Sequence, residues 1–233
     1  MIGIIGALDE EVTLVSNCLE NRKSIDKAGS VFHTGRLDGH EATVVKCGVG
    51  KVNAAICTQI LIDGFGCEKI IFGGVAGSLL KGLVQGDVVI SSYTVQFDID
   101  LTAFGRRRGE LADRERMIEA DSDMIQAGTD AFDALCDTIP DPPTLMVGTI
   151  VSGDSFISDP DTIKWLQREF GAACTEMEGG AVGYTCRLNT LPFVIIRIIS
   201  DSADEEATGD FQSFLKKSSH LLFQLISGTV NRL

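Results

Sequence analysis

Acidic side chains follow several apolar runs of this sequence, in places where a carboxylate could move protons. Three of them follow the run IGIIG, two stand in the stretch TEMEGGA, and one follows PFVIIRIIS: Asp9, Glu10, Glu11, Glu176, Glu178 and Asp201. An acid beside a buried segment is costly to desolvate unless it has a partner, and a carboxylate held in such a place can act as a general acid or base. The sequence therefore raises the question whether these acids converge on one site.

The stretch TEMEGGA, residues 175–181, has a structural as well as a chemical interpretation. Thr175 and Glu178 have the spacing of a capping box, in which two side chains satisfy free amides at the start of a helix. On its own the stretch favours that interpretation, and Glu176 is taken as structural. The two glycines that follow are poor helix formers, however, which leaves a second purpose for Glu178 open.

Glu10, Glu11 and Asp201 differ in how well a structural role explains them. Acids in the first turn of a helix complement its dipole. This structural role is the preferred explanation for Glu10, whereas for Glu11 a structural and a catalytic role are about equally supported. A carboxylate at the mouth of the first strand is also placed to take a proton from water. Asp201 could cap the following turn, beside Ser200 and Ser202, but its position after the most hydrophobic run favours a chemical role.

Two glycine-rich stretches could bring backbone amides close to a ligand. CGVGKVNAA, residues 47–55, resembles a phosphate loop, but Val45 and Val52 stand where that motif requires a glycine and a hydroxyl residue. A tight turn from a strand into a helix is the simpler interpretation, and a turn whose amides approach a ligand is the alternative. GGVAGS, residues 73–78, leaves the same two interpretations open.

Composition and charge exclude several classes of function. The 233 residues are 44% hydrophobic and carry a net charge of -13, so the chain can bury a core but would repel nucleic acids and anionic membranes. Arg106, Arg107 and Arg108 form the one dense basic cluster. The first apolar run is too short for a signal peptide or a membrane span, which predicts a cytoplasmic protein. The seven cysteines and three histidines lack the spacing of a metal site or a nucleophilic triad, which predicts buried, reduced thiols.

The elements that must position these residues follow from short apolar runs that alternate with stretches of helical period. We predict strands at residues 2–5, 42–48, 68–74, 85–95, 142–151 and 191–200, and helices at 10–20, 51–65, 161–170 and 211–226. This order predicts one α/β domain over residues 1–233, with a mixed, largely parallel sheet that is flanked by helices. Residues 98 to about 116 form the one long irregular excursion, and such loops are often functional.

The ends of the predicted strands would bring the candidate residues together. Open α/β sheets bind ligands beyond the carboxyl ends of their strands. Four such ends carry small or acidic residues: Gly6 with the acids after it, the turn GVAGS, the stretch SGDSFI, and Asp201. The sequence therefore predicts one crevice to which four segments contribute.

Six stretches of the chain resemble the 5′-methylthioadenosine/S-adenosylhomocysteine nucleosidases of the nucleoside phosphorylase-like superfamily. They are GALDEEV at 6–12, GVGKVNAA at 48–55, DLTAFG at 100–105, VSGDSFI at 151–157, EMEGGA at 176–181 and IISDSAD at 198–204. Any one would be a weak indication, whereas six in order over almost the whole chain are specific. The resemblance implies a nucleoside phosphorylase-like fold. It also implies hydrolysis of the N-glycosidic bond between adenine and a 5′-thio-substituted ribose, with no cofactor and no metal.

The resemblance further implies a role for each matching residue. Glu11 would activate the water, Glu178 would hold the ribose hydroxyls, and Asp201 would protonate adenine N7. Met177 would pack on the ribose, Phe156 would stack on the purine, and the backbone of Ile157 would read its Watson–Crick edge. The substrate-binding set implied by the resemblance also contains Val75, Ala76, Gly77, Ser200 and Phe211.

Elementary chemistry agrees with this assignment of roles. Breaking a ribosidic bond develops positive charge on the sugar and negative charge on the departing base. A carboxylate beside the ring and a proton donor at the base therefore lower the barrier together. Burial at a strand end should also raise the pKa of Asp201, so that it holds a proton near neutral pH.

The resemblance has two further implications, one for the loop that contains Leu101 and Phe104 and one for Val75. The resemblance implies a homodimer in which Leu101 and Phe104 reach the neighbouring subunit's 5′-substituent pocket, and an apolar pair in a charged loop suits a contact surface. Val75 stands where members of the family often carry serine, so a polar contact near the ligand is missing. Substrate preference is therefore open among methylthioadenosine, S-adenosylhomocysteine, 5′-deoxyadenosine and aminodeoxyfutalosine.

Two other functions remain as alternatives on the sequence alone. A purine nucleoside phosphorylase of the same fold would use phosphate in place of water. Phosphate would need cations near the first glycine turn, which instead carries Asp9, Glu10 and Glu11. A nucleoside-binding protein without activity is the second alternative, because a fold alone does not establish catalysis.

Overall fold

The chain forms one mixed sheet with helices on both of its faces. The computed structural model describes residues 1–111, 115–202 and 211–233, and for residues 201, 202 and 211–213 it describes the backbone only. The sheet has ten strands in the order β10-β6-β8-β9-β5-β1-β4-β3-β2, with β7 paired to β6. The strands are β1 Ile2–Gly6, β2 Glu20–Lys27, β3 Ser30–Leu37, β4 His40–Lys46, β5 Lys69–Ser78, β6 Val88–Gln96, β7 Ile118–Glu119, β8 Leu145–Ser152, β9 Ala172–Glu176 and β10 Phe193–Ser202. The helices are α1 Asp9–Asn17, α2 Lys51–Phe65, the short η1 Thr102–Phe104, α3 Ser122–Cys136, α4 Pro160–Phe170, α5 Gly179–Leu188 and α6 Phe211–Val230.

The strands that position Glu11, Val75 and Asp201 run parallel to one another. β1 lies between β4 and β5 and is parallel to both, and β5 is parallel to β10 over its length. Antiparallel pairs lie around them, among them β2–β3–β4 and β5–β9. The predicted α/β class, with a mixed and helix-flanked sheet, is therefore confirmed.

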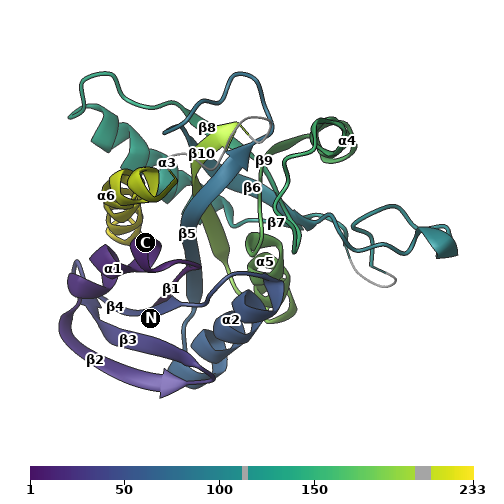
Figure 1. The fold of residues 1–233 in the computed structure, drawn as a ribbon. Coiled ribbons are helices and arrows are strands. Elements are labelled where there is room, and N and C mark those ends of the chain that lie inside the picture. The colour runs from purple at the N-terminus through teal and green to yellow at the C-terminus, as the bar shows by residue number, and fades with distance from the viewer. Residues whose placement is uncertain (112–114, 203–210) are drawn as a thin grey trace.

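Alternate residues of the central strands supply two separate cores. Ile5 and Phe72 pack on the face that carries α2 and α5, whereas Ile4 and Ile71 pack on the face that carries α1, α3 and α6. Figure 1 shows these two groups of helices on opposite sides of β1 and β5. Because successive strand residues point to opposite faces, a strand covered on both faces is apolar throughout. This is why the central strands were the easiest elements to predict.

Elements without such a pattern could not be predicted from the sequence. The edge strand β2 is exposed at every residue, so its sequence ENRKSIDK shows no alternation between apolar and polar positions. Helix α5 begins at two glycines, Gly179 and Gly180, which are poor helix formers. A Cβ atom on Gly179 would lie 2.7 Å from Ile195 Cδ1, and one on Gly180 would lie 2.9 Å from Gln96 Cγ. Close packing against the sheet explains these glycines.

The loop between β6 and β7 projects from the body of the molecule and carries η1 (Figure 1). The basic cluster on this loop is paired with acids: Arg106 with Glu110, Arg107 with Glu169, and Arg108 with Asp100. The cluster therefore offers no free basic surface to a polyanion. No helix in the described part of the chain is long and apolar enough to cross a membrane.

Five of the seven cysteines are buried and all seven are free thiols, as predicted for most of them. Cys18 is exposed and Cys136 is half-buried, so the prediction of burial is wrong for these two. Cys18 directly follows α1, where the chain turns toward the exposed strand β2.

Candidate active site

Glu11 is buried in the first turn of α1 and accepts hydrogen bonds from three backbone amides. Its Oε2 accepts from Ala7 N at 2.6 Å and from Leu8 N at 2.9 Å, and its Oε1 accepts from Val75 N at 3.0 Å. The first two amides belong to the turn after β1 and the third to β5, so Glu11 lies between the carboxyl ends of two adjacent strands. Burial raises the pKa of Glu11 above its usual range, although the nearby Arg197 opposes this effect.

Glu178 lies at the start of α5 and is buried as well. Its Oε1 accepts a hydrogen bond from Gly50 N at 2.7 Å, at the N-terminus of α2. Burial raises the pKa of Glu178 to about 7, and the negative charge of Glu176 adds to this effect. The carboxyl group therefore exchanges its proton near neutral pH.

Arg197 is the group that sequence reasoning missed. It lies in β10 inside the apolar run PFVIIRIIS and is 1% exposed. Its guanidinium forms an ion pair with Glu176 and lies 4.0 Å from the ring centroid of Phe72. A Cβ atom at Gly74 would lie 1.9 Å from Arg197 Nη1 and 2.7 Å from Glu11 Oε1. Only glycine at that position lets these two charged groups approach β5 so closely.

The buried charges therefore form one cluster of three carboxylates and one guanidinium. The positive charge of Arg197 interacts with Glu176, Glu11 and Glu178 in that order of strength. One cation cannot balance three anions in a medium of low polarity, so the cluster favours protonation of its unpaired members. Glu176 is the member in direct contact with Arg197, which leaves Glu11 and Glu178 as the carboxyls with raised pKa values.

The capping box expected from Thr175 and Glu178 is not formed. The side chain of Glu178 makes no capping hydrogen bond, and Thr175 Oγ1 is buried without a hydrogen-bond partner among the described residues. Glu176 caps the helix instead, because its carboxylate accepts from Glu178 N at 3.1 Å and from Gly179 N at 2.7 Å. The structural role predicted for Glu176 agrees with these contacts, and Glu178 remains free for another purpose.

Changing Glu178 and Glu176 to glutamine should alter the free energy of unfolding in opposite directions. The folded protein holds the proton of Glu178 more tightly than the unfolded chain, because its pKa is raised from 4.5 to about 7. Ionising this group thus costs stability, and the cost grows between these two pH values and is complete above the higher one. Glu178→Gln, which cannot ionise, should raise the free energy of unfolding at pH 8 by roughly 1–3 kcal/mol and have little effect near pH 4.5.

Glu176→Gln is the matched control, since it removes one negative charge two residues away. It leaves the buried Arg197 without its anion, so it should lower the free energy of unfolding by about 3–5 kcal/mol. Urea unfolding of both variants at pH 8 measures the two effects. A similar loss of stability in both would contradict the assignment and return Glu178 to a structural role.

The glycine-rich turn at the end of β5 faces the end of β10. Val75 contributes its amide to Glu11, and Ala76 O accepts a hydrogen bond from Ser200 Oγ at 3.2 Å. The backbone of Asp201 pairs with Gly77, after a register shift in β10 that follows Ile199. The side chain of Asp201 lies outside the described residues, as does that of Phe211. Their backbones belong to β10 and α6.

Three further candidates surround a small cavity beside the acidic cluster. The cavity has a volume of about 40 Å³ and is lined by Gly77, Ser155, Phe156, Ile157, Thr175, Glu176 and Met177. Phe156 is 65% exposed, which is unusual for a phenylalanine that serves only the core. The structure thus brings Phe156, Ile157 and Met177 together with Gly77, in agreement with their predicted neighbourhood.

Leu101 and Phe104 are not part of this grouping. They lie on the projecting loop, and Phe104 is 82% exposed. Neither residue lines the cavity that contains Phe156. The structure of one chain therefore does not bring these two residues to that cavity.

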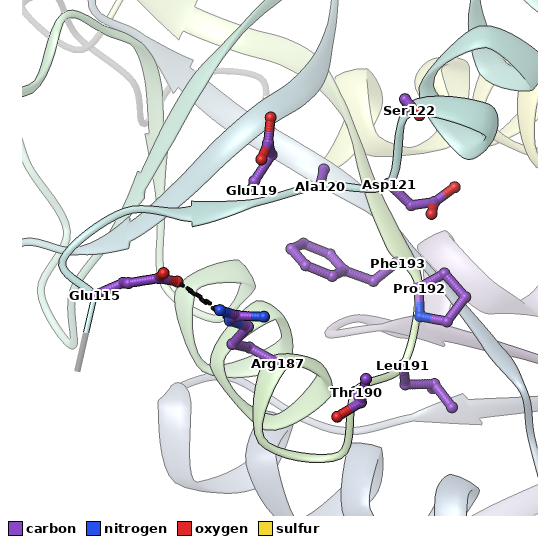
Figure 2. Close-up of a pocket in the computed structure, with 10 residues that line it drawn as sticks. All are labelled: Glu115, Glu119, Ala120, Asp121, Ser122, Arg187, Thr190, Leu191, Pro192 and Phe193. Atoms are coloured by element: carbon purple, nitrogen blue, oxygen red, sulfur yellow. Dashed lines mark hydrogen bonds and ion pairs between the residues drawn. The ribbon is translucent and has the colours of Figure 1, made fainter. Parts of the chain in front are cut away.

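A larger cavity lies at the opposite end of β10 (Figure 2). It has a volume of about 560 Å³ and is lined by Glu115, Glu119, Ala120, Asp121, Ser122, Arg187, Thr190, Leu191, Pro192 and Phe193. None of the predicted site residues lines it. The larger cavity also contains none of the three buried carboxylates, so its size alone does not identify it as the site.

Comparison with known proteins relates the whole chain to one group of enzymes. Residues 1–231 match the family model of the phosphorylase superfamily. The 5′-methylthioadenosine/S-adenosylhomocysteine nucleosidase of Geobacillus thermodenitrificans is 39% identical, over 96% of this chain and 95% of that protein.

Solved structures give the same relationship. The nucleosidase of Neisseria meningitidis in complex with methylthio-immucillin-A has a TM-score of 0.93 and 34% identity, over 100% of this chain and 99% of that one. Futalosine hydrolase of Helicobacter pylori has a TM-score of 0.92 and 34% identity, over 100% of this chain and 97% of that one. The predicted nucleoside phosphorylase-like fold is confirmed. The chain belongs to the phosphorylase superfamily and, within it, to the family of 5′-methylthioadenosine/S-adenosylhomocysteine nucleosidases.

Proposed function

We propose that the protein hydrolyses the N-glycosidic bond of 5′-methylthioadenosine and S-adenosylhomocysteine, and releases adenine and the 5′-substituted ribose. The observation that carries this proposal is the pair of buried carboxyl groups, Glu11 and Glu178, whose pKa values are raised beside a single guanidinium. Sequence similarity to a nucleosidase, over 96% of this chain and 95% of that protein, supports the same reaction.

Glu11 serves as the base that activates water. Three amide hydrogen bonds fix the direction of its carboxylate, and its raised pKa brings its proton affinity closer to that of a base working near neutral pH. Water adds to C1′ of the ribose, and one of its protons passes to Glu11. The bond from C1′ to the purine nitrogen breaks, and its electrons leave with the base.

Glu178 serves as the acceptor for the ribose hydroxyls. Its Oε1 is occupied by Gly50 N, which leaves the second oxygen and the remaining lone pairs for a sugar. Its negative charge also opposes the positive charge that develops on the ring, which stabilises the transition state more than the ground state. Met177, beside it in the chain, packs against the ribose.

The purine binds on the side of the small cavity that Phe156 and Ile157 line. Phe156 stacks on the ring and the backbone of Ile157 contacts its edge, a use that suits the exposure of the Phe156 side chain. Asp201 donates the proton to N7 as the bond breaks. The register shift before Asp201 supports this role, because bulges next to active sites redirect side chains.

The product and its dependence on phosphate test this function against phosphorolysis. Lys46, at the end of β4, is paired with Asp9 at 2.9 Å, so its charge is already matched by an acid of the first turn. We expect adenine release, followed by absorbance, in a phosphate-free buffer at substoichiometric enzyme, with a free sugar as the second product. A strict need for phosphate, or a sugar phosphate as product, would support the phosphorylase instead, and no release would indicate a binding protein.

Substrate preference is tested by comparing the activity of the protein on related nucleosides. The futalosine hydrolase among the similar structures has a TM-score of 0.92, against 0.93 for the Neisseria nucleosidase, which makes aminodeoxyfutalosine a worthwhile substrate to test. The measurement is kcat/KM for four nucleosides side by side: methylthioadenosine, S-adenosylhomocysteine, 5′-deoxyadenosine and aminodeoxyfutalosine.

The protein works as a homodimer in this proposal, with Leu101 and Phe104 reaching the neighbouring subunit's 5′-substituent pocket. An apolar stripe at the start of α2 adds support, since Val52 and Ile56 are 69% and 44% exposed and residues four apart share one helix face. Val49, in the turn before α2, is 50% exposed as well. A stripe and an apolar loop tip on one chain suit burial against a second copy.

A charge in the apolar stripe tests the dimer. The protein should sediment as a dimer, and Val52→Glu should convert it to a monomer with reduced activity, because an unpaired carboxylate in an apolar interface is costly. On a monomer the same change would alter an exposed residue and have little effect. Analytical ultracentrifugation with a parallel activity assay measures both. A fully active monomer in the unmodified protein would contradict both the dimer and the shared pocket.

A further inference from the structure

Lys51, Asp98 and Asp154 form a closed ring of hydrogen bonds, which we call the Lys51 ring. Lys51 N donates to Asp154 Oδ1 at 2.8 Å, Asp154 N donates to Asp98 Oδ2 at 3.0 Å, and Lys51 Nζ donates to Asp98 Oδ1 at 2.5 Å. The three residues come from α2, the segment after β6 and the loop after β8. The ring therefore joins segments that lie far apart in the sequence.

The ring explains the lysine of the stretch GVGKVNAA. The stretch resembles a phosphate loop, but the ammonium of Lys51 is held by Asp98 in an ion pair whose side chains are 15% and 29% exposed. The adjacent amides of Gly50 and Lys51 are likewise taken by Glu178 and Asp154. The donors of this turn thus serve carboxylates of the protein itself.

These contacts place the ring between the two ends of the proposed nucleoside site. On one side, Gly50 N holds Glu178, and Gly50 is the residue before Lys51. On the other side, Asp154 lies two residues before Phe156 and anchors that loop to α2 and to Asp98. Any shift of Asp154 relative to α2 would change the spacing between Glu178 and the loop of Phe156.

Charge shows why Lys51 is the critical member. The carboxylates of Asp98 and Asp154 lie close together, because the backbone amide of Asp154 donates a hydrogen bond to Asp98. The ammonium of Lys51 is the cation of the ring. Without that cation the two like charges repel each other. The loop of Asp154 would then move away from the start of α2.

We infer that Lys51, Asp98 and Asp154 are positioning residues that set the distance between the ribose carboxylate and the purine loop. The inference rests on the proposed function, because it takes Glu178 and Phe156 as the groups at the two ends of the substrate. None of the three ring residues needs to touch the substrate. Their effect reaches the reaction through the geometry of the groups that do, and enzymes are sensitive to misplacement on the scale of about 1 Å.

Lys51→Met tests the ring, since it keeps the aliphatic stem and the backbone amide but removes the cation. We expect kcat/KM for methylthioadenosine to fall about 10- to 100-fold. The Kd for adenine alone, which occupies only the purine side, should change less than about threefold, because the loop itself is intact. Lys51→Arg should recover most of the activity. In the double variant Lys51→Met/Asp98→Asn, the second change should add little, because the two residues act as one unit.

Lys164→Met is the matched control, because it removes a lysine from an ion pair with Asp161 in which both side chains are largely exposed. It should leave activity and adenine affinity unchanged. If Lys51→Met retains full kcat/KM, or if it weakens adenine and lowers the melting temperature in parallel, the positioning role is wrong. If the unmodified protein releases no adenine, the proposed function fails. The ring is then judged by the ratio of the Kd for methylthioadenosine to the Kd for adenine, which Lys51→Met should raise about 10-fold or more.

Discussion

Glu11→Gln should abolish most of the turnover while the protein still binds its nucleoside. The change removes the carboxylate that we propose as the base for water, and a positioned base typically contributes about 10²- to 10⁴-fold in rate. The side chain keeps its shape, so the ribose and purine contacts remain. We therefore expect kcat for methylthioadenosine to fall by at least about 100-fold with a small change in Kd.

The surroundings of Glu11 require a control for folding. Both of its oxygens accept amide hydrogen bonds, whereas a glutamine side chain offers one acceptor and one donor group. The NH₂ group must then face at least one backbone N–H, and an unsatisfied buried amide costs about 1–3 kcal/mol. Removing a carboxyl whose pKa is raised by burial offsets part of this cost.

Nucleoside binding and melting temperature therefore accompany the kinetic measurement. A folded variant that binds methylthioadenosine and does not turn it over supports the role of Glu11 as base. Turnover within a few-fold of the unmodified protein would show that another group activates the water.

The pH dependence of kcat/KM gives a second check on the same residue. Glu11 must be ionised to act as a base, and the pKa of this buried carboxyl lies above its usual range. Activity should thus fall on the acid side, as the proton returns to Glu11, at a higher pH than an exposed glutamate would require. The pKa of Glu178 is raised to about 7, and in the proposed mechanism this group must also be ionised to oppose the charge on the ribose.

The sequence contained enough information to place Glu11 and the turn of Val75 at one edge of the sheet. Glu11 follows a strand with an apolar pattern, and the carboxyl ends of parallel strands meet at one edge of the sheet, so its proximity to the turn of Val75 could be expected. The resemblance added Glu178, which local spacing alone had assigned to a capping box. The structure supports a different division of work within TEMEGGA, because Glu176 holds the helix start.

Contacts that depend on distant partners could not be predicted in the same way. Arg197 looks like an interruption of an apolar strand, and only its burial beside Glu176 gives it a purpose. A signal was nevertheless present, since an arginine inside a buried strand requires a buried anion, and few acids were available at the ends of neighbouring strands. Lys51 is a second case, because the sequence predicted a tight turn at this position but not the ion pair of its ammonium with Asp98.

Val75 shows how a departure from the family can be compatible with the site. The serine expected at this position would add a hydroxyl, but the contact that Val75 makes with Glu11 comes from its backbone amide. A backbone donor is independent of the side chain. The hydrogen bond that fixes Glu11 therefore survives the substitution, and any consequence for substrate preference must come from the side chain alone.

The other large effect is expected at Asp201, for which Asp201→Asn should lower kcat by about 100-fold or more while the substrate still binds. Adenine is a poor leaving group as an anion, and a proton delivered to N7 neutralises it as the bond breaks. Asparagine keeps the shape of the side chain and can donate a hydrogen bond, but it cannot transfer a proton. The backbone of Asp201 pairs with Gly77 directly after the register shift in β10, so the position borders the same turn that contributes Val75.

A substrate with a different leaving group separates proton transfer from simple positioning at Asp201. A nucleoside whose base is more acidic leaves without full protonation, so its kcat should be much less affected by Asp201→Asn than that of methylthioadenosine. If N7 is protonated in the transition state, the ratio of the two kcat values should change by about 10-fold or more between the unmodified protein and the variant. Equal losses on both substrates in a folded variant would mean that Asp201 holds the purine or supports the turn, and that the proton comes from elsewhere.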